Sequence, residues 1–466
     1  MENLIHLIKN VNDALNSFIW GPIMLIAFLS VGFMFTIRTG IFQITHLHDW
    51  LDVTFLQLFR NKKVIKTNDR HAISQFQSLC TALAGTIGTG NIAGVATAIV
   101  TGGPGSIFWM WVSAFLGMMT IYAENVLGIK YRYKNKEGNW VGGAMIYIER
   151  GLGLKWLAII YSIFYALASF GIGNMTQANS IACSFKVSYG VDPKVTGILL
   201  MIIISIVIIG GIKRIASIVD KFVPLMSIFY IMGGIAVILV NYEKIPFAFA
   251  MIFKEAFNFR ATSAGVIGYG IAIAMQKGIS RGVFSNEAGL GSSVTVNSAS
   301  DVKEPVIQGM WGIFEVLVDT LIICTITALA ILTSGVYNTK QYLVDINNGI
   351  DVISGTALTN KAFMSAIPFG GEIVSISIIL FAFSTLLAWS YYGERAVTYL
   401  FGNKAIKPYK ILFVCFINVG CVTSLNLVWD ISDTLNGFMA IPNLIAITLM
   451  SDEVITITKN YISHKG

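Results

Sequence analysis

Charged residues are scarce in this sequence. Only 12% of its 466 residues are Asp, Glu, Lys or Arg, whereas 55% are apolar and the mean hydropathy is +0.71. A soluble globular chain carries about 25% charged residues, and soluble cores stop growing beyond roughly 250–300 residues. A soluble protein of this length would therefore need two domains, but no polar linker divides the chain. The composition excludes an ordinary soluble protein and predicts an integral membrane protein.

Residues that carry enzymatic, redox or metal chemistry are also few. The five histidines stand in expected loops, near the chain ends or at the edge of an apolar run: His6, His46, His48, His71 and His464. The five cysteines stand mostly within apolar runs: Cys80, Cys183, Cys324, Cys415 and Cys421. Neither H-E-x-x-H nor G-x-S-x-G occurs, and no C-x-x-C pair occurs. These absences argue against a membrane enzyme and indicate that the cysteines are small buried side chains.

Long apolar runs are what the chain does have. About 20 apolar residues cross the hydrocarbon of a bilayer, and the N-terminus lacks the basic region and cleavage site of a signal peptide, so its first run is expected to stay as a span. The 53 residues from 71 to 123 carry no formal charge and are divided by Gly102-Gly103-Pro104-Gly105. Counting this run as two spans, we predict eleven: 14–37, two within 71–123, 156–185, 195–212, 222–242, 261–299, 305–335, 373–393, 411–429 and 434–451. The shorter segments 143–154 and 245–259 are expected to form interfacial helices or loop caps.

The net charge of +7 and the pI of about 9.0 could suggest nucleic-acid binding, but the basic residues lie in short segments between apolar runs. If the N-terminus is outside, 22 of the 32 Lys and Arg residues fall in inner segments. This is the positive-inside pattern. We therefore expect a multi-pass plasma-membrane protein with its N-terminus outside, its C-terminus in the cytoplasm and no nucleic-acid partner.

Two of the expected spans contain helix-breaking clusters. One is G-T-I-G-T-G-N-I-A-G at 85–94, and the other is G-V-F-S-N-E-A-G-L-G at 282–291. A glycine in a helix interior costs about 1 kcal/mol relative to alanine. Backbone that leaves the helix inside a membrane is tolerated only where it lines a polar cavity or is buried in protein. Close packing of small residues between helices is the alternative interpretation, but two clusters accompanied by Thr, Ser and Asn favour a binding site.

The positions of the clusters predict an inverted repeat. With the first span set aside, each cluster falls in the first helix of a group of five, as in transporters built from inverted repeats. We therefore expect an extra N-terminal helix and cytoplasmic loop (1–71), a first five-helix repeat (72–242), an extracellular linker (243–261), a second repeat (262–451) and a cytoplasmic tail (452–466).

Several strings resemble the alanine or glycine:cation symporter family, also called sodium:alanine symporters. They are GTGNIAGVATAI (88–99), GGPGSIFWMW (102–111), GAMIYIERGLG (143–153), GGIKRIASIVDKFVP (210–224) and RGVFSNEAGLGSS (281–293). The resemblance covers about residues 15–450. It implies an all-α integral membrane protein with a leucine-transporter-type fold of five plus five inverted helices and one extra N-terminal helix, which agrees with the eleven spans counted from the sequence.

The resemblance also implies site residues. It places the substrate carboxylate on the backbone of Thr89 and Gly90, and it places three further side chains around the substrate: Gln177, Phe284 and Trp389. The sodium site common to the fold matches two carbonyls and two hydroxyls: those of Ala84 and Ile87, and those of Ser384 and Thr385. Asn91 matches a ligand of a second sodium ion, although the other ligands of that site are not all matched.

Each of these side chains has a simpler alternative role. Gln177 could hydrogen-bond a neighbouring helix, and Ser384 and Thr385 could bond carbonyls one turn earlier. Trp389 could belong to an interfacial aromatic belt. Arg281 and Glu287 flank the second cluster and could pair with each other, either as a gate or as a static brace, and Lys277 could snorkel to the interface. The other charges in or near spans, which are functional candidates by default, are Glu124, Glu315 and Asp319.

The sequence therefore predicts a secondary transporter that imports alanine and/or glycine together with Na⁺ by alternating access, with the lipid bilayer as its surroundings. Coupling to H⁺ is the alternative, and a membrane channel is a weaker one.

Overall fold

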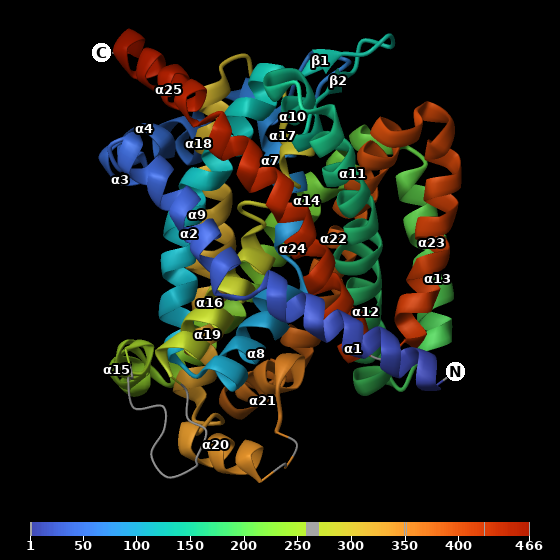
Figure 1. Ribbon diagram of the computed structural model, residues 1–466. Helices are drawn as coiled ribbons and strands as arrows, with labels where there is room; N and C mark the ends of the chain where they lie inside the picture. Colours follow the sequence, from blue (N-terminus) through green and yellow to red (C-terminus); the bar gives the residue numbers. More distant parts are fainter. Residues whose placement is uncertain (1, 258–269, 349, 351, 424, 466) are drawn as a thin grey trace.

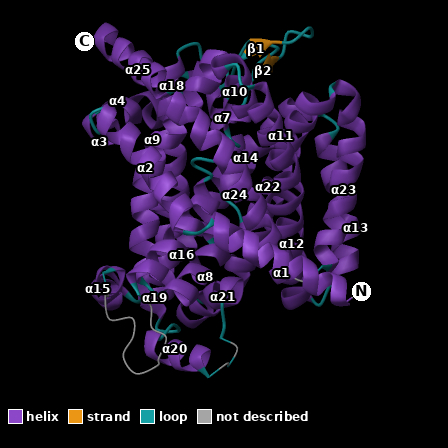
Figure 2. Ribbon diagram, in the orientation of Figure 1, coloured by secondary structure: helices purple, strands orange, loops and turns teal. Residues whose placement is uncertain are grey.

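The computed structural model describes residues 2–257, 270–348, 350, 352–423 and 425–465. Helices run between two ends of the molecule, and the two termini lie at opposite ends (Figure 1). The strands in the described residues form one short antiparallel hairpin, β1 (Tyr133–Lys134) and β2 (Trp140–Val141), seen at the C-terminal end in Figure 2. This confirms the predicted all-α class.

The N-terminal part bends before the bundle begins. Its helices are α1 (Glu2–Ile19), α2 (Pro22–Arg38), α3 (Phe42–Thr45), α4 (Leu47–Leu51), the π-helix η1 (Asp52–Leu56), α5 (Gln57–Arg60) and α6 (Lys62–Ile65). Gly21 separates α1 from α2, and Pro22 takes the first helical position of α2, where its missing N–H costs nothing. In Figure 1, α1 lies obliquely across the bundle while α2 runs along it.

The predicted first repeat forms two half-helices followed by long helices. They are α7 (Gln75–Thr86), the 3-10 turn η2 (Thr89–Asn91), α8 (Ala93–Gly102), α9 (Gly105–Tyr131), α10 (Ala144–Leu152), α11 (Lys155–Phe170), the π-helix η3 (Gly171–Met175), α12 (Thr176–Tyr189), α13 (Pro193–Ile208) and α14 (Gly211–Val240). Ser74 and Gln77 form a capping box at the start of α7. As expected, the chain turns between α8 and α9, where Gly103 has φ 74°.

The remaining helices follow a short connection. They are the 3-10 turn η4 (Tyr242–Lys244), α15 (Ile245–Ala256), α16 (Ile271–Asn286), α17 (Val294–Asn297), α18 (Pro305–Val316), the π-helix η5 (Leu317–Cys324), α19 (Thr325–Ser334), α20 (Thr339–Asn347), α21 (Gly355–Ala366), α22 (Gly370–Phe401), the 3-10 turn η6 (Asn403–Ala405), α23 (Ile406–Val422), α24 (Leu425–Leu449) and α25 (Ser451–Lys465). The predicted linker 243–261 and the start of the predicted span 261–299 fall partly on residues 258–269, which lie outside the described residues.

Seven helical stretches among the described residues are long and apolar enough to cross a membrane, and some of them join consecutive helices, such as α1 and α2. They are 10–38, 105–131, 155–187, 211–240, 305–334, 370–401 and 403–422. The pair 428–449 and 451–464, bent by 58°, raises this to eight if it forms one span. The three other predicted spans coincide with helices too short for this test, namely α7–α8, α13 and α16–α17. The count of eleven therefore stays a prediction.

Two predicted boundaries are wrong because they were placed at charges. The segment 213–221 was expected to be a loop but lies within α14, and the chain turns instead at Ile209 and Gly210. The tenth span was expected to end at Trp429, but α23 ends at Val422, and Trp429 belongs to α24 together with Asp430 and Asp433. The spans were delimited at charged residues, and this criterion fails where charged residues lie inside a helix of the bundle.

The two interrupted helices run in opposite directions. In Figure 1, α7 lies toward the C-terminal end and α8 toward the other, whereas α16 lies below α17. Ile73, just before α7, donates its N–H to Ala299 O at 3.0 Å, and Asp301 donates its N–H to Ile73 O at 3.0 Å. The start of the first interrupted helix therefore meets the end of the second, which is the antiparallel course expected of inverted repeats.

A glycine pair tests the close packing of the bundle. A Cβ on Gly278 of α16 would lie 2.1 Å from the carbonyl oxygen of Ser106 on α9, whereas a Cβ on Gly94 of α8 would meet only Arg281 Cδ, at 3.9 Å. We expect Gly278→Ala to lower the free energy of unfolding by about 1–3 kcal/mol, because the backbone must move. Gly94→Ala should be neutral or slightly stabilising. Thermal unfolding in detergent, followed by size-exclusion chromatography, measures both variants, and equal midpoints would contradict the expectation.

Candidate functional site

The first interruption lies between α7 and α8. Gly88 is extended (φ −137°, ψ −155°), and its N–H donates to Asn91 Oδ1 at 2.9 Å. Thr89 and Gly90 form part of the short 3-10 turn that follows. The first N–H groups of a helix have no intrahelical acceptors, so this turn and the start of α8 present donors to a negatively charged group.

The second interruption follows α16. Glu287 adopts left-handed geometry (φ 58°), which is uncommon for a residue other than glycine, and Gly289 and Gly291 also have positive φ. Gly289 N–H donates to Glu124 Oε1 of α9 at 3.0 Å, and Asn443 of α24 donates to Gly289 O at 2.9 Å. Side chains from two other helices thus satisfy the backbone freed by the break.

The two interruptions meet in the middle of the bundle. A Cβ on Gly90 would lie 3.2 Å from Phe284 Cδ1. Beside this contact, Asp319 in η5 connects both helices: Asn91 Nδ2 donates to its Oδ1 at 2.7 Å, and Ser285 Oγ donates to its Oδ2 at 2.8 Å. A buried carboxylate therefore sits between the two broken helices, surrounded by amide and hydroxyl groups.

Two predicted substrate residues carry buried polar atoms that have no hydrogen-bond partner among the described residues. Thr89 Oγ1 and Gln177 Oε1 are both unpartnered, and a Cβ on Gly88 would lie 3.5 Å from that Gln177 oxygen. Gln177 Nε2 donates to Ile172 O of its own helical segment at 2.9 Å, so the side chain does not bridge to a neighbouring helix through this donor. Unsatisfied buried groups call for an explanation, and a bound polar ligand supplies one.

Trp389 is fully buried, which excludes a place in an interfacial belt. Its Nε1 donates to Glu287 Oε1 at 3.0 Å. A Cβ on Gly173 of η3 would lie 2.3 Å from Trp389 Cβ, so only glycine fits there. Trp389 thereby connects the second interruption with the π-helix that precedes Gln177.

The predicted cation residues are only partly brought together. Thr385 Oγ1 lies 3.4 Å from Ile87 O, at the end of α7, and also bonds Phe381 O at 3.0 Å. Ser384 Oγ bonds Phe381 O at 2.8 Å and contacts Met226 Sδ at 3.5 Å. Ala84 is buried in α7. The back-bonding alternative thus holds for both hydroxyls, while Thr385 also contacts the predicted carbonyl.

A cavity of about 710 Å³ opens beside the site, at the end of the bundle that holds α8 and α21. Trp429 and Arg281 line it. Trp429 stacks on Phe284 with ring centroids 5.1 Å apart, and the guanidinium of Arg281 lies 5.5 Å from the Phe284 ring. Arg281 forms an ion pair with Asp433 of α24 at 2.6 Å.

The hypothesis that Arg281 pairs with Glu287 is therefore wrong. Both residues flank the break along the chain, but Arg281 faces the cavity, whereas Glu287 accepts hydrogen bonds from Trp389 and Ser292. Lys277, one turn before Arg281, packs its stem near Gly102 at the end of α8.

Sequence reasoning missed most partners of the buried carboxyl groups. It flagged Glu124, Glu315 and Asp319 only because they are charges within spans. It overlooked Asn443, whose side chain donates hydrogen bonds to both Glu124 and Gly289. It also overlooked Asp433, the ion-pair partner of Arg281. The available signal was the presence of polar residues in the last span, but their partners lie more than 150 residues away along the chain.

Comparison with solved structures supports the fold alone. The Eremococcus coleocola manganese transporter superposes with a TM-score of 0.50 at 12% identity, over 82% of this chain and 78% of that one. A second crystal structure of the same transporter, its H236A mutant, gives the same score at 10% identity, over 84% and 81% of the two chains. The predicted leucine-transporter-type fold is confirmed.

Comparison with known sequences supports the family. The Methanococcus maripaludis sodium/alanine symporter AgcS is 46% identical over 96% of both chains. The Bacillus subtilis probable sodium/glutamine symporter GlnT is 35% identical over 98% of this chain and 92% of its own length. The profile of the sodium:alanine symporter family matches residues 5–466. The chain thus belongs to the sodium:alanine symporter family, and it is a multi-pass membrane transporter rather than an enzyme.

Proposed function

We propose that this protein imports alanine and/or glycine by symport with Na⁺ through alternating access. The observation that carries the proposal is the meeting of the two interrupted helices at Gly90 and Phe284, beside the unpartnered buried oxygens of Thr89 and Gln177. Irregular backbone at membrane depth, placed at corresponding positions of two repeats, is where such transporters bind their substrates. The name of the M. maripaludis relative supports alanine as the cargo.

The substrate would bind between these elements. Its carboxylate would accept from the N–H groups of Thr89 and Gly90, where the positive end of the helix dipole favours an anion by about 0.3–2 kcal/mol. Gln177 would offer its free carbonyl oxygen to the ammonium group. Phe284 and Trp389 would bound the side-chain space, so a short side chain fits and a long one is excluded by collision.

Na⁺ would bind near the end of α7. The carbonyl of Ile87 and the hydroxyl of Thr385 already lie together, and the carbonyl of Ala84 and the hydroxyl of Ser384 would complete the oxygen ligands after a rotation of the Ser384 side chain. Freed carbonyls at a half-helix C-terminus suit a monovalent cation. One charge moving through ~100 mV releases about 2.3 kcal/mol, which sustains roughly a 50-fold substrate gradient at 1.36 kcal/mol per tenfold.

Proton coupling is the second candidate, and Asp319 is the observation that favours it. Within the described ranges, Asp319 forms no ion pair with Lys or Arg, although it is fully buried. A buried carboxyl group needs either a proton or a cation to balance its charge. Asp319 and Asn91 could hold a second Na⁺ or take up H⁺, and the ion gradients described below distinguish the two.

The proposed location is the plasma membrane, with the N-terminus outside. The basic segments 38–70 and 130–155 both lie at the C-terminal end of the bundle in Figure 1, which the positive-inside rule assigns to the cytoplasm. The wide cavity lined by Arg281 and Trp429 would then face outward. The proposed repeats are 72–242 and 262–451, joined by an extracellular linker at 243–261.

Reconstituted protein provides the direct test of transport. Proteoliposomes should accumulate radiolabelled alanine or glycine with an inward Na⁺ gradient, and uptake should saturate with concentration. Gly90→Val should abolish uptake, because its side chain would collide with Phe284, whereas Gly94→Ala, one turn further along, should retain it. Accumulation driven by a pH gradient alone would favour proton coupling, and unsaturable flux independent of ions would indicate a channel.

Removing the Thr385 hydroxyl tests the cation site. Thr385→Val keeps the shape of the side chain but removes an oxygen that faces Ile87 O. We expect the Na⁺ concentration for half-maximal uptake to rise at least threefold, with little change in protein yield. Ser390→Ala is the matched control, since Ser390 on the same helix bonds only Leu387 O among the described residues. An unchanged Na⁺ dependence in Thr385→Val would place the ion elsewhere.

Trp389 and its partner Glu287 test the size limit. Trp389→Leu should let leucine compete with alanine uptake at least tenfold better, and Glu287→Leu should have a similar effect because the indole loses its acceptor. Glu287→Gln keeps an oxygen acceptor and should largely retain the limit. Trp311→Phe, which removes a hydrogen bond to Gln75 elsewhere in the bundle, serves as the control. An active Trp389→Leu variant that still rejects leucine would show that Trp389 does not set the upper limit on substrate size.

A further inference from the structure

A second cavity, of about 180 Å³, lies at the opposite end of the molecule from the wide one. It is formed by the β1–β2 hairpin, α10 and the end of α22. None of the residues proposed for the substrate or the cation lines it. It is therefore separate from the proposed transport site.

The guanidinium of Arg395 lines this cavity as a candidate anion-binding group, and hydrogen bonding to Glu394 fixes its position. Its Nη2 donates to Glu394 at 2.7 Å, and Lys410 donates to the other oxygen of the same carboxylate at 2.9 Å. Two cations thus share one carboxylate, which leaves one positive charge in excess. Arg395 Nε is buried and has no hydrogen-bond partner in the part of the chain that the structure describes, although a guanidinium can bind a carboxylate through two parallel hydrogen bonds.

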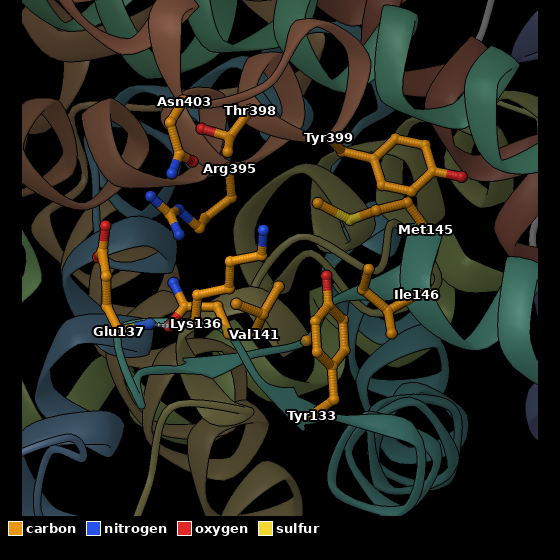
Figure 3. A pocket seen from close by; sticks show the side chains of 12 residues that line it. Tyr133, Lys136, Glu137, Val141, Met145, Ile146, Arg395, Thr398, Tyr399 and Asn403 are labelled. Atoms are coloured by element: carbon orange, nitrogen blue, oxygen red, sulfur yellow. Dashed lines mark hydrogen bonds between the residues drawn. The ribbon is translucent and has the colours of Figure 1, made fainter.

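The rest of the cavity has two unlike sides. Figure 3 shows Arg395, Asn403 and Glu137 on one side and Met145, Ile146 and the ring of Tyr399 on the other. Two cations, Arg395 and Lys136, and the Glu137 carboxylate beside an apolar wall are complementary to the carboxylate, ammonium and side chain of a free amino acid. An apolar cavity of about 150 Å³ in another protein holds benzene, so this one has room for a small amino acid.

We propose that this cavity binds a free amino acid from the cytoplasm, with its carboxylate on Arg395 and its ammonium group facing Glu137, and that occupancy slows uptake. The hairpin is tied to the segment that follows the second interrupted helix: Arg132 donates to Ser298 O at 2.9 Å, and a Cβ on Gly142 would collide with Ser298. A ligand that joins the hairpin to α22 would resist movement of this segment. The site goes beyond the proposed transport function, which uses other residues.

Equilibrium binding of tritiated L-alanine to purified full-length protein separates the two sites. In Gly90→Val the transport site is blocked, and we expect one equivalent of alanine to bind still. Adding Arg395→Gln should lower that affinity at least tenfold, and Arg395→Lys should not restore it, because the planar fork is lost. Glu394 keeps Lys410 as a partner in both variants, so no uncompensated charge is created.

Substitutions at two exposed positions, Glu137 and Lys404, test the site without disturbing the fold. Glu137→Gln should weaken binding to Gly90→Val, whereas Lys404→Gln, which removes a positive charge near the cavity but outside its lining, should not. Failure of Gly90→Val to bind alanine, or equal binding with and without Arg395→Gln, would overturn the proposal.

Uptake measured with amino acid inside the vesicles tests the regulatory role. Internal alanine should lower the initial rate of labelled glycine uptake by the unmodified protein several-fold more than by Arg395→Gln, with Lys404→Gln behaving like the unmodified protein. Equal inhibition of all three would overturn regulation by this cavity. Uptake by empty vesicles reports separately on the proposed transport function, so the failure of one proposal is distinguishable from the failure of the other.

Discussion

Backbone N–H and C=O groups cannot be left without partners in hydrocarbon, and the arrangement of the site follows from how this chain meets that requirement where two helices break. At the first break, Gly88 N–H is satisfied by Asn91 within the same segment. At the second, Glu124 and Asn443 reach in from other helices to bond Gly289. Other helices also contribute to the first break, because Thr385 of α22 and Thr359 of α21 bond the carbonyls of Ile87 and Ile92. Both breaks therefore depend on neighbouring helices keeping their places.

This dependence links the shape of the site to the positions of the surrounding helices. A break stabilised from outside is sensitive to movement of the helices that stabilise it, and Trp389 adds a further connection through Glu287. At Gly173 an added Cβ would lie 2.3 Å from Trp389 Cβ, so η3 and α22 are closely packed there. Movement of α22 or η3 would therefore displace Trp389 and rearrange its hydrogen bond to Glu287 at the second break. Packed interfaces shift between discrete arrangements rather than deforming continuously.

Charge is distributed unevenly through the bundle. Arg281, which lines the wide cavity, is neutralised by its ion pair with Asp433. Further inside, Glu124, Glu287, Glu315 and Asp319 are all buried, and none of them forms an ion pair within the described part of the chain. Uncompensated carboxylates are costly in a membrane and mark ion or proton pathways. The acidic interior is therefore suited to a protein whose substrates include a cation.

The sequence by itself determined the class, the family, the two helix breaks and the approximate positions of the helices. Apolar runs specify spans because their length must match the bilayer, glycine clusters weaken the helix wherever they fall inside such a run, and the strings around 88–99 and 281–293 are long enough to identify relatives. Only the tertiary structure decided which side chains meet. Arg281 pairs with Asp433, 152 residues away, rather than with Glu287 six residues on, and Trp389 is buried against Gly173 rather than placed at the interface. The helix boundaries near residues 210 and 423 also escaped prediction, because Asp220 and Asp433 find their partners inside the bundle. In the sequence, a charged residue indicates a loop. In the structure, a partner on a distant helix stabilises that charge within a span, and the packing of the helices determines which residue is the partner.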